Sequence, residues 1–380
     1  MLVSIRETQP APARERLLYL DNLRTFLTAL VICHHAAIAA GATGGWYWAL
    51  PAPPDSESAL LLTVFTAVNQ AFFMSLFFAI SAYVTPASYD AKGAAAFLRD
   101  RFARLGIPLV VYFFVLNPIL SWLIVRLRDG DAAGLVAFVS RDYGHLVGPG
   151  PLWFVLALLV FGSAYAAARV ASGHPREVTG THPFPSDRTI LGFVVGIGLT
   201  AFLVRFVFPT GWDVLGLQLG YFPLYVAFFT FGLRAHANRW LDGLDRPFVA
   251  CWGRRARWAM PLLLATPFVG GIGQVNGGPH LAALLYAMWE PWICVGMSAW
   301  LLVLFRERWA TQGRLARRLS RGAYTAYIVH PFFVVAGTAL VALLPPQPLL
   351  RFVVLCALAV PATFAVADGI RRLPGLSRIL

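Results

Sequence analysis

Ten apolar stretches, each close to the length of a membrane-crossing helix, recur along the chain. A helix rises about 1.5 Å per residue, so about 20 apolar residues cross the roughly 30 Å hydrocarbon core of a bilayer. Hydrophobic residues make up 58% of the chain and charged residues 13%, whereas soluble proteins average roughly 25% charged residues. The sequence therefore predicts an all-α, polytopic membrane protein. The predicted spans are residues 19–41, 59–85, 105–125, 150–170, 189–208, 219–236, 258–274, 281–305, 322–344 and 349–370.

The cationic residues are unevenly distributed among the segments that join these spans. The chain has 31 lysines and arginines and a net charge of +13. If the N-terminus is cytoplasmic, 25 of these residues flank the inner ends of the spans and five lie near the outer ends. This bias is typical of an even number of spans with both termini in the cytoplasm. We interpret the positive charge as a signal for the bilayer and not for nucleic acid. The five outer arginines are Arg126, Arg128, Arg141, Arg205 and Arg351.

The spans follow one another closely enough to form one domain. We expect a transmembrane domain over residues 19–370, flanked by cytoplasmic segments 1–18 and 371–380. The four cysteines are scattered without a CxxC spacing, so we predict neither a disulfide nor a metal site.

The first span carries the ionisable residues that are hardest to explain by packing alone. Arg24 and His35 are eleven residues apart, which is three helical turns to within roughly 20°, so they share one face of the helix. His34 points roughly 80° away from Arg24, and Asp21 is placed to hold the guanidinium. Snorkelling of Arg24 and hydrogen bonding of the histidines within the bundle is the simpler alternative. Because ionisable side chains in a span are costly, we favour a functional role for Arg24 and His35.

A second cluster lies between spans two and three. Arg101 and Arg104 are three residues apart, so on an α-helix they share a face at the cytoplasmic interface. Two guanidinium groups in this arrangement can grip a phosphate. The alternative is that both arginines bind lipid headgroups.

Span eight contains an isolated carboxylate, Glu290. By helical rise Glu290 lies roughly 13 Å and His35 roughly 9 Å from the outer end of its span, so the two could meet. Alternatively, Glu290 is protonated and hydrogen-bonds a neighbouring helix. Pro291 leaves a carbonyl one turn earlier without its donor and predicts a kink.

Other polar and aromatic residues in the spans need partners. His330 is expected nearer the cytoplasmic side, in a packing or binding role. Asn69 and Ser81 are polar groups for which a substrate is one possible partner. The run 46–48 (Trp-Tyr-Trp) is interpreted as an interfacial anchor, with stacking on sugar rings as the alternative.

Taken together, these motifs resemble the integral-membrane acyltransferase 3 family and occur in the order found in that family. The matches are Leu20–Arg24 for LDxLR; Arg24 and His35 for arginine, ten residues, histidine; Phe77–Ala82 for FFxxSG, with Ala82 where glycine is usual; Arg101, Arg104 and Pro108 for an arginine pair followed by proline; Leu152–Phe154 for LWF; and Tyr324, Tyr327, His330 and Pro331 for YxxYxxHP.

The resemblance implies an acyltransferase of the cell inner membrane. Its donor would be acyl-coenzyme A from the cytoplasm, and its acceptor a hydroxyl group of a glycan or another cell-envelope molecule. An acetyl or succinyl group would be transferred, since the layout is similar to that of glucan succinyltransferase-like members. The expected catalytic residues are His35, Glu290 and Arg24, with Arg101 and Arg104 joining Arg24 in binding the donor. The expected substrate-binding residues are Asn69, Ser81, Trp153 and His330.

Within this interpretation His35 acts either as a general base or as the carrier of the acyl group. A transporter that uses the same buried histidine, glutamate and arginine as a relay is the alternative function. A non-catalytic receptor or scaffold would leave the buried ionisable groups without a role.

Overall fold

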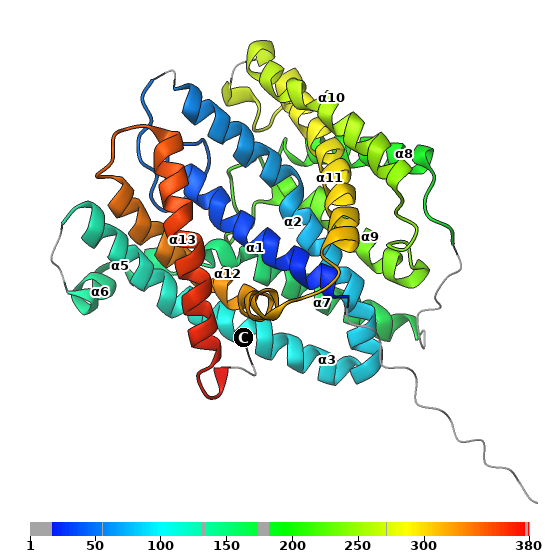
Figure 1. Cartoon of the computed structure of the whole chain (residues 1–380), viewed down its shortest axis with the longest axis horizontal. Helices are drawn as coiled ribbons and strands as arrows, with labels where there is room; N and C mark the ends of the chain where they lie inside the picture. The colour runs from blue at the N-terminus through cyan, green and yellow to red at the C-terminus, as the bar shows by residue number, and fades with distance from the viewer. Residues whose placement is uncertain are drawn as a thin grey trace, which may run out of the picture.

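The computed structural model is helical along almost all of the chain that it describes, which is residues 17–54, 56–130, 134–173, 182–270, 272–376 and 379 (Figure 1). No strand occurs within these residues. The predicted N-terminal segment lies outside them except for residues 17 and 18. The elements are α1 Leu18–Ala39, α2 Glu57–Lys92, α3 Ala94–Arg101, η1 Phe102–Gly106, α4 Ile107–Val111, η2 Tyr112–Leu116, α5 Asn117–Arg128, α6 Leu135–Leu146, η3 Gly150–Leu152, α7 Trp153–Ser172, α8 Asp187–Val204, η4 Leu219–Tyr221, α9 Phe222–Asn238, α10 Arg246–Gly270, η5 Ile272–Gln274, α11 Leu281–Arg308, α12 Arg314–Val341 and α13 Pro348–Arg371.

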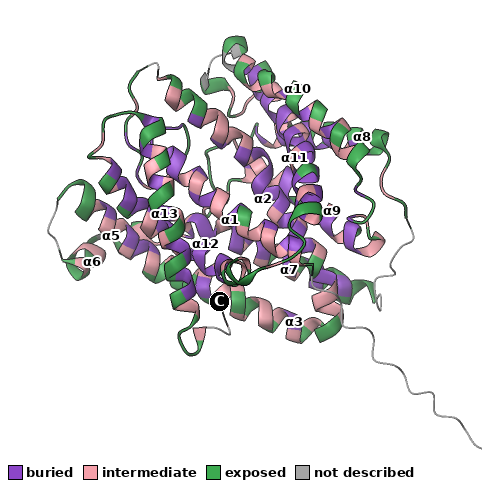
Figure 2. Cartoon of the chain, in the orientation of Figure 1, coloured by how far each residue is buried: buried purple, intermediate pink, exposed green. Residues whose placement is uncertain are grey.

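Helix α1 lies at the centre of the bundle, in contact with α2, α11, α12 and α13 (Figures 1 and 2). Its leucines Leu23 and Leu27 are completely buried. At the end of α1 that we predict to be cytoplasmic, the inner end, Asn22 Nδ2 donates to the carbonyls of Trp309 at 2.8 Å and Thr311 at 3.0 Å. The first helix is thereby fixed to the connection between α11 and α12.

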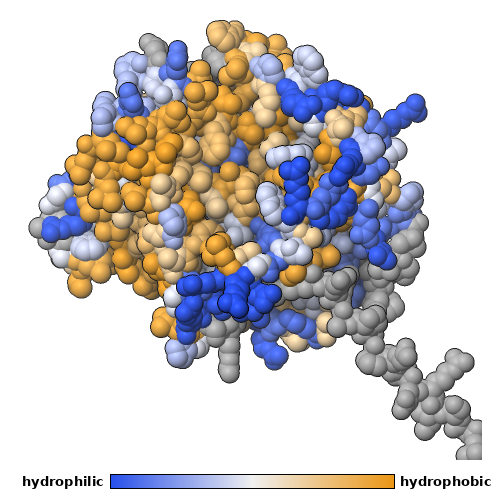
Figure 3. Space-filling view, viewed as in Figure 1, coloured by the Kyte–Doolittle hydropathy of each residue, from blue (hydrophilic) through white to orange (hydrophobic). Residues whose placement is uncertain are grey.

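Seven helices are long and apolar enough to cross a membrane, counted over the described residues. They confirm a polytopic all-α protein. Predicted spans 19–41, 219–236 and 258–274 coincide with α1, α9 and part of α10, which are not among the seven, so the count of ten remains a prediction. A broad hydrophobic face with hydrophilic groups gathered at its borders fits a lipid-facing surface (Figure 3).

Prolines free backbone carbonyls along the continuous helical segment from α3 to α5. Two π-helical turns, η1 and η2, interrupt this segment, and a proline follows each of them. A proline has no N–H, so the carbonyl four residues earlier loses its α-helical donor. In both cases a tyrosine hydroxyl contacts that carbonyl: Tyr324 with Arg104 at 2.9 Å, and Tyr143 with Phe114 at 2.8 Å.

Helices α2 and α9 approach closely because small residues meet between them. A Cβ atom at Gly232 would lie 2.3 Å from the carbonyl oxygen of Ala79 and 2.8 Å from the Cβ of Ala82. Small residues at such crossings allow two helix backbones to come together. The alanine at position 82, where the resembled family has glycine, is therefore accommodated by the missing side chain at Gly232.

The segment after α1 folds back over the outer end of that helix. The amide of Leu50 donates to the carbonyl of Ala39 at 2.9 Å. Gly150, at a φ of +46°, lies so close to Tyr47 that a Cβ would clash with the Tyr47 hydroxyl. These contacts place the aromatic run 46–48 against the bundle.

Candidate active site

His35 projects from the outer half of α1 into an aromatic site. Its Nδ1 lies 2.9 Å from Nε2 of His330, and the two rings are nearly parallel, at 7°. Trp46 stacks on His35 with ring centroids 3.9 Å apart and 16° between the planes. His35 is only partly buried, and its Nε2 has no hydrogen-bond partner among the described residues. The ring is thus held in place with one nitrogen left available.

His330 of α12 is completely buried and supports His35 from within the bundle. Its Nδ1 lies 2.6 Å from the carbonyl oxygen of Tyr327. The hydroxyl of Tyr327 in turn donates to the carbonyl of Pro151 in η3, next to α7. The expectation that His330 lies nearer the cytoplasmic side than His35 is wrong, since the two side chains are in contact.

His34 faces a different part of the bundle, as helical spacing indicates. It is buried, and its ring lies against Phe73 with centroids 5.0 Å apart. Its Nδ1 has no hydrogen-bond partner within the described chain. The surroundings of His34 are those of a packed core residue.

At the inner end of α1, Arg24 and Arg101 lie near one another. Arg24 is paired with Asp21 at 3.7 Å, and its positive charge also acts on Arg101. Arg101 donates to the hydroxyl of Thr85 at 2.6 Å and lies over the ring of Phe97 at 5.0 Å. Two guanidinium groups in this arrangement suit an anionic ligand such as a phosphate.

Arg104 does not accompany Arg101. Arg101 ends α3 and is half-buried, whereas Arg104 lies within the π-helical turn η1 and is exposed. The expectation of a shared face assumed α-helical spacing, which the wider π turn interrupts.

Glu290 is not a partner of His35. Its Oε2 accepts from Nη2 of Arg205, and its Oε1 has no hydrogen-bond partner among the described residues. Both side chains are buried, and the Arg205 guanidinium lies over the rings of Tyr221 at 5.2 Å and Tyr286 at 5.4 Å. The expected Glu290–His35 contact is therefore absent, because an arginine assigned to the outer side takes the carboxylate.

The remaining predicted site residues lie in other surroundings. Asn69 is buried with no partner for its Nδ2 in the described part of the chain, and Ser81 is half-buried. Trp153 stacks on Tyr225 with centroids 5.5 Å apart, and Tyr225 accepts from Gln70 at 3.0 Å. None of the three predicted residues hydrogen-bonds to His35 or His330 within the described residues.

Sequence reasoning missed two residues of the site, Trp46 and Tyr327. Trp46 was interpreted as an interfacial anchor. The role of Tyr327 could have been predicted from the sequence. It lies four residues before Pro331, so its carbonyl lacks the α-helical donor and is free to accept from another group.

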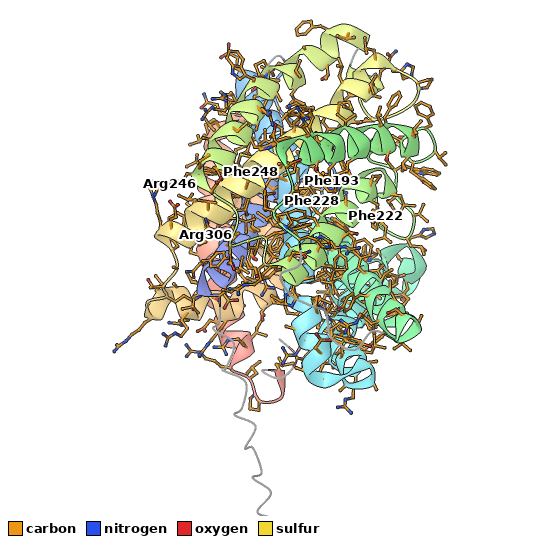
Figure 4. All side chains as sticks on the ribbon, turned by 90° about the vertical axis from the view of Figure 1, so that its right-hand side faces the viewer. Phe193, Phe222, Phe228, Arg246, Phe248 and Arg306 are labelled. Carbon is orange, nitrogen blue, oxygen red and sulfur yellow. The ribbon has the colours of Figure 1, made fainter. Side chains whose placement is uncertain are left out.

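A separate apolar cavity of about 390 Å³ opens on another face of the bundle. It lies among α2, α8, α9, α10 and α11, and its lining includes Phe193, Phe228 and Phe248 (Figure 4). Among the described residues, Arg234 is the only charged one in the lining. The cavity contains none of the predicted site residues. Over the described residues, no group of three or more metal-ligating side chains occurs.

Comparison with known proteins agrees with the motif order. The family described as an acyltransferase domain, acyltransferase 3, matches residues 17–368. No curated protein and no solved structure matches the chain.

Proposed function

The chain belongs to the acyltransferase 3 family of integral-membrane acyltransferases, and from that premise we propose that it moves an acyl group from acyl-coenzyme A to a hydroxyl group of a cell-envelope acceptor. The donor enters from the cytoplasm, the acyl group is acetyl or succinyl, and the acceptor is a glycan. The membrane is the cell inner membrane.

The observation that carries this proposal is the arrangement of two unlike sites on one helix. Arg24 lies at the inner end of α1 beside Arg101, and His35 lies three turns further along, partly exposed beside His330 and Trp46. The separation of Arg24 and His35 is roughly 16 Å along the helix axis. A cationic cluster can hold the phosphates of coenzyme A while its long pantetheine arm carries the thioester toward the histidine.

His35 serves as the general base in this proposal. The acceptor hydroxyl gives its proton to Nε2 of His35 as its oxygen bonds to the thioester carbonyl carbon. The carbon–sulfur bond then breaks, and the leaving thiolate takes the proton from His35. The products are an ester and the free thiol of coenzyme A, and His35 returns to its starting state.

The test is acyl transfer by purified protein in lipid nanodiscs, followed through release of the coenzyme A thiol from acetyl- or succinyl-coenzyme A. We expect His35→Ala to lower turnover on the order of 10²–10⁴-fold, which is the usual contribution of a general base. The matched variant His34→Ala should keep most of the activity in the fraction that folds. Full turnover in His35→Ala, or equal losses in the two variants, would remove His35 from this role.

A further inference from the structure

The hydrogen-bond partners of His330 determine where its hydrogen atoms lie. Its Nδ1 is 2.6 Å from the carbonyl oxygen of Tyr327, and a carbonyl oxygen can only accept. That oxygen is available because the residue four positions later is Pro331, which has no N–H to donate to it. Nδ1 of His330 therefore carries a hydrogen.

Burial then determines whether the second ring nitrogen of His330, Nε2, carries a hydrogen. A ring with hydrogens on both nitrogens would be a cation, and burying a cation without an anionic partner is costly. His330 is completely buried, and its partners in the described chain are the Tyr327 carbonyl and His35, neither of them an anion. A neutral His330 has a lone pair on Nε2, so Nε2 accepts.

The same reasoning reaches His35. Because Nε2 of His330 accepts, Nδ1 of His35 must be the donor across the 2.9 Å that joins them. In a neutral imidazole only one nitrogen carries a hydrogen, so Nε2 of His35 has the lone pair. This is the nitrogen without a partner in the described residues, on the ring that is partly exposed.

We propose that His330 is a positioning residue that holds His35 in the tautomer needed to accept a proton at Nε2, and that Pro331 sets this chain of hydrogen bonds by freeing the Tyr327 carbonyl. The catalytic consequence rests on the proposed function. When His35 becomes an imidazolium, its Nδ1–H bond to His330 stabilises the new charge. An aspartate does this in many catalytic triads, whereas here a neutral histidine and a backbone carbonyl do it.

The first test does not depend on activity. The protein is labelled with ¹⁵N-histidine and reconstituted in lipid, and ¹⁵N NMR distinguishes ring nitrogens that carry a hydrogen from those that do not. His35→Gln and His330→Gln identify the signals. We expect a hydrogen on Nδ1 and none on Nε2 for both residues. The opposite tautomer for either residue would overturn the proposal.

The second test separates positioning from packing. His330→Leu fills the site but cannot accept, so we expect kcat to fall on the order of 10²–10⁴-fold with an unchanged KM for the acyl donor. His330→Gln can present its side-chain oxygen near the former Nε2 and should recover at least tenfold over leucine. Equal kcat for wild type and His330→Leu would contradict the proposal, as would equal losses in the leucine and glutamine variants.

Pro331→Ala provides an independent variant in which the histidines remain. The new N–H competes with His330 for the Tyr327 carbonyl, so we expect an intermediate loss of kcat and a mixed tautomer signal for His330. Pro361→Ala removes a proline from the interior of α13 and is the matched control, with kcat unchanged. An inactive His35→Ala together with a fully active His330→Leu would refute the positioning role of His330 and leave the proposed function intact.

Discussion

Glu290 and Arg205 form an ion pair inside the helical bundle of a membrane protein. The pair is buried, with aromatic rings over the guanidinium. Removing one partner of such a pair leaves an uncompensated charge, which costs about 3–5 kcal/mol of stability. We therefore assign the pair a structural role: it stabilises the packing of the end of α8 against α11.

For this reason Glu290→Gln should lower stability more than it lowers the rate of the chemical step. We expect a clear drop in thermal unfolding temperature in detergent and, where the variant is folded, a kcat within about threefold of wild type. The double variant Arg205→Met/Glu290→Leu removes both charges and should regain part of the lost stability. A fully stable Glu290→Gln variant whose kcat falls a hundredfold would restore the catalytic role expected from sequence.

Single residues were predictable from sequence where the relationship lay within one helix. The shared face of Arg24 and His35, and the separation of His34, follow from helical periodicity. The partner of Glu290 could not be predicted in this way. The position of a residue along its span gives its depth in the membrane, but it does not tell which neighbouring helix the side chain contacts. The contact between His35 and His330 was missed for the same reason: they lie on α1 and α12, and depth counted from span boundaries was too coarse to align them.

At the scale of an element, the π turn η1 separates two arginines that were expected to act together. We predict that Arg101→Ala weakens coenzyme A binding by about tenfold to a hundredfold, the value of a hydrogen bond to a charged group. Arg104→Ala should weaken it by less than about threefold, since its side chain is exposed. Isothermal titration calorimetry in detergent measures both, and equal losses would return the two arginines to one shared face.

The crossing of α2 and α9 depends on small side chains at Ala82 and Gly232. Ala82→Leu inserts bulk where backbones nearly touch and should cost about 1–3 kcal/mol. Ala82→Gly restores the residue usual in the resembled family and should cost no more than about 1 kcal/mol, the difference in helix propensity. Thermal unfolding in one detergent compares them. A leucine variant as stable as wild type would mean that the two helices can separate freely.

The positions of most helices were predictable because apolar length and flanking arginines mark where a helix crosses a membrane, but their boundaries were not, since α10 begins at Arg246 and the predicted span begins at 258. The π turns were not predictable, because Pro108 enters the prediction only as part of a family motif and Pro118 does not enter it. Their consequence becomes visible once tyrosines from distant elements are seen on the freed carbonyls. The same device recurs at Pro331, where the donor is a histidine of the candidate site.

At the scale of the whole molecule, α1 contributes residues to both the arginine cluster around Arg24 and the site around His35. The orientation of α1 in the membrane therefore decides which side each of them faces. The class of fold followed from hydrophobic length and composition, which are properties of the chain as a whole. The packing order of the helices did not follow from these properties, because helices far apart in sequence also pack together: α1 contacts α12 and α13 from the far end of the chain. Which end of α1 faces the cytoplasm rests on the arginine bias alone.

That orientation predicts which connections are reachable from outside the cell. In a variant with its four cysteines replaced, single cysteines at Ser56 and Gln347 should react with a membrane-impermeant maleimide on intact cells, since both precede helices that start at the predicted outer side. Cysteines at Gly93 and Gly313 should react only after the membrane is opened, because they lie at inner connections among the arginines that disfavour translocation. The pattern requires an even number of spans between Gly93 and Gly313 and an odd number between Ser56 and Gly93. Labelling of Gly313 from outside together with protection of Gly93 would mean that the count between them is odd, and the reverse pattern at all four positions would place the arginine cluster, and with it the donor site, on the outer face.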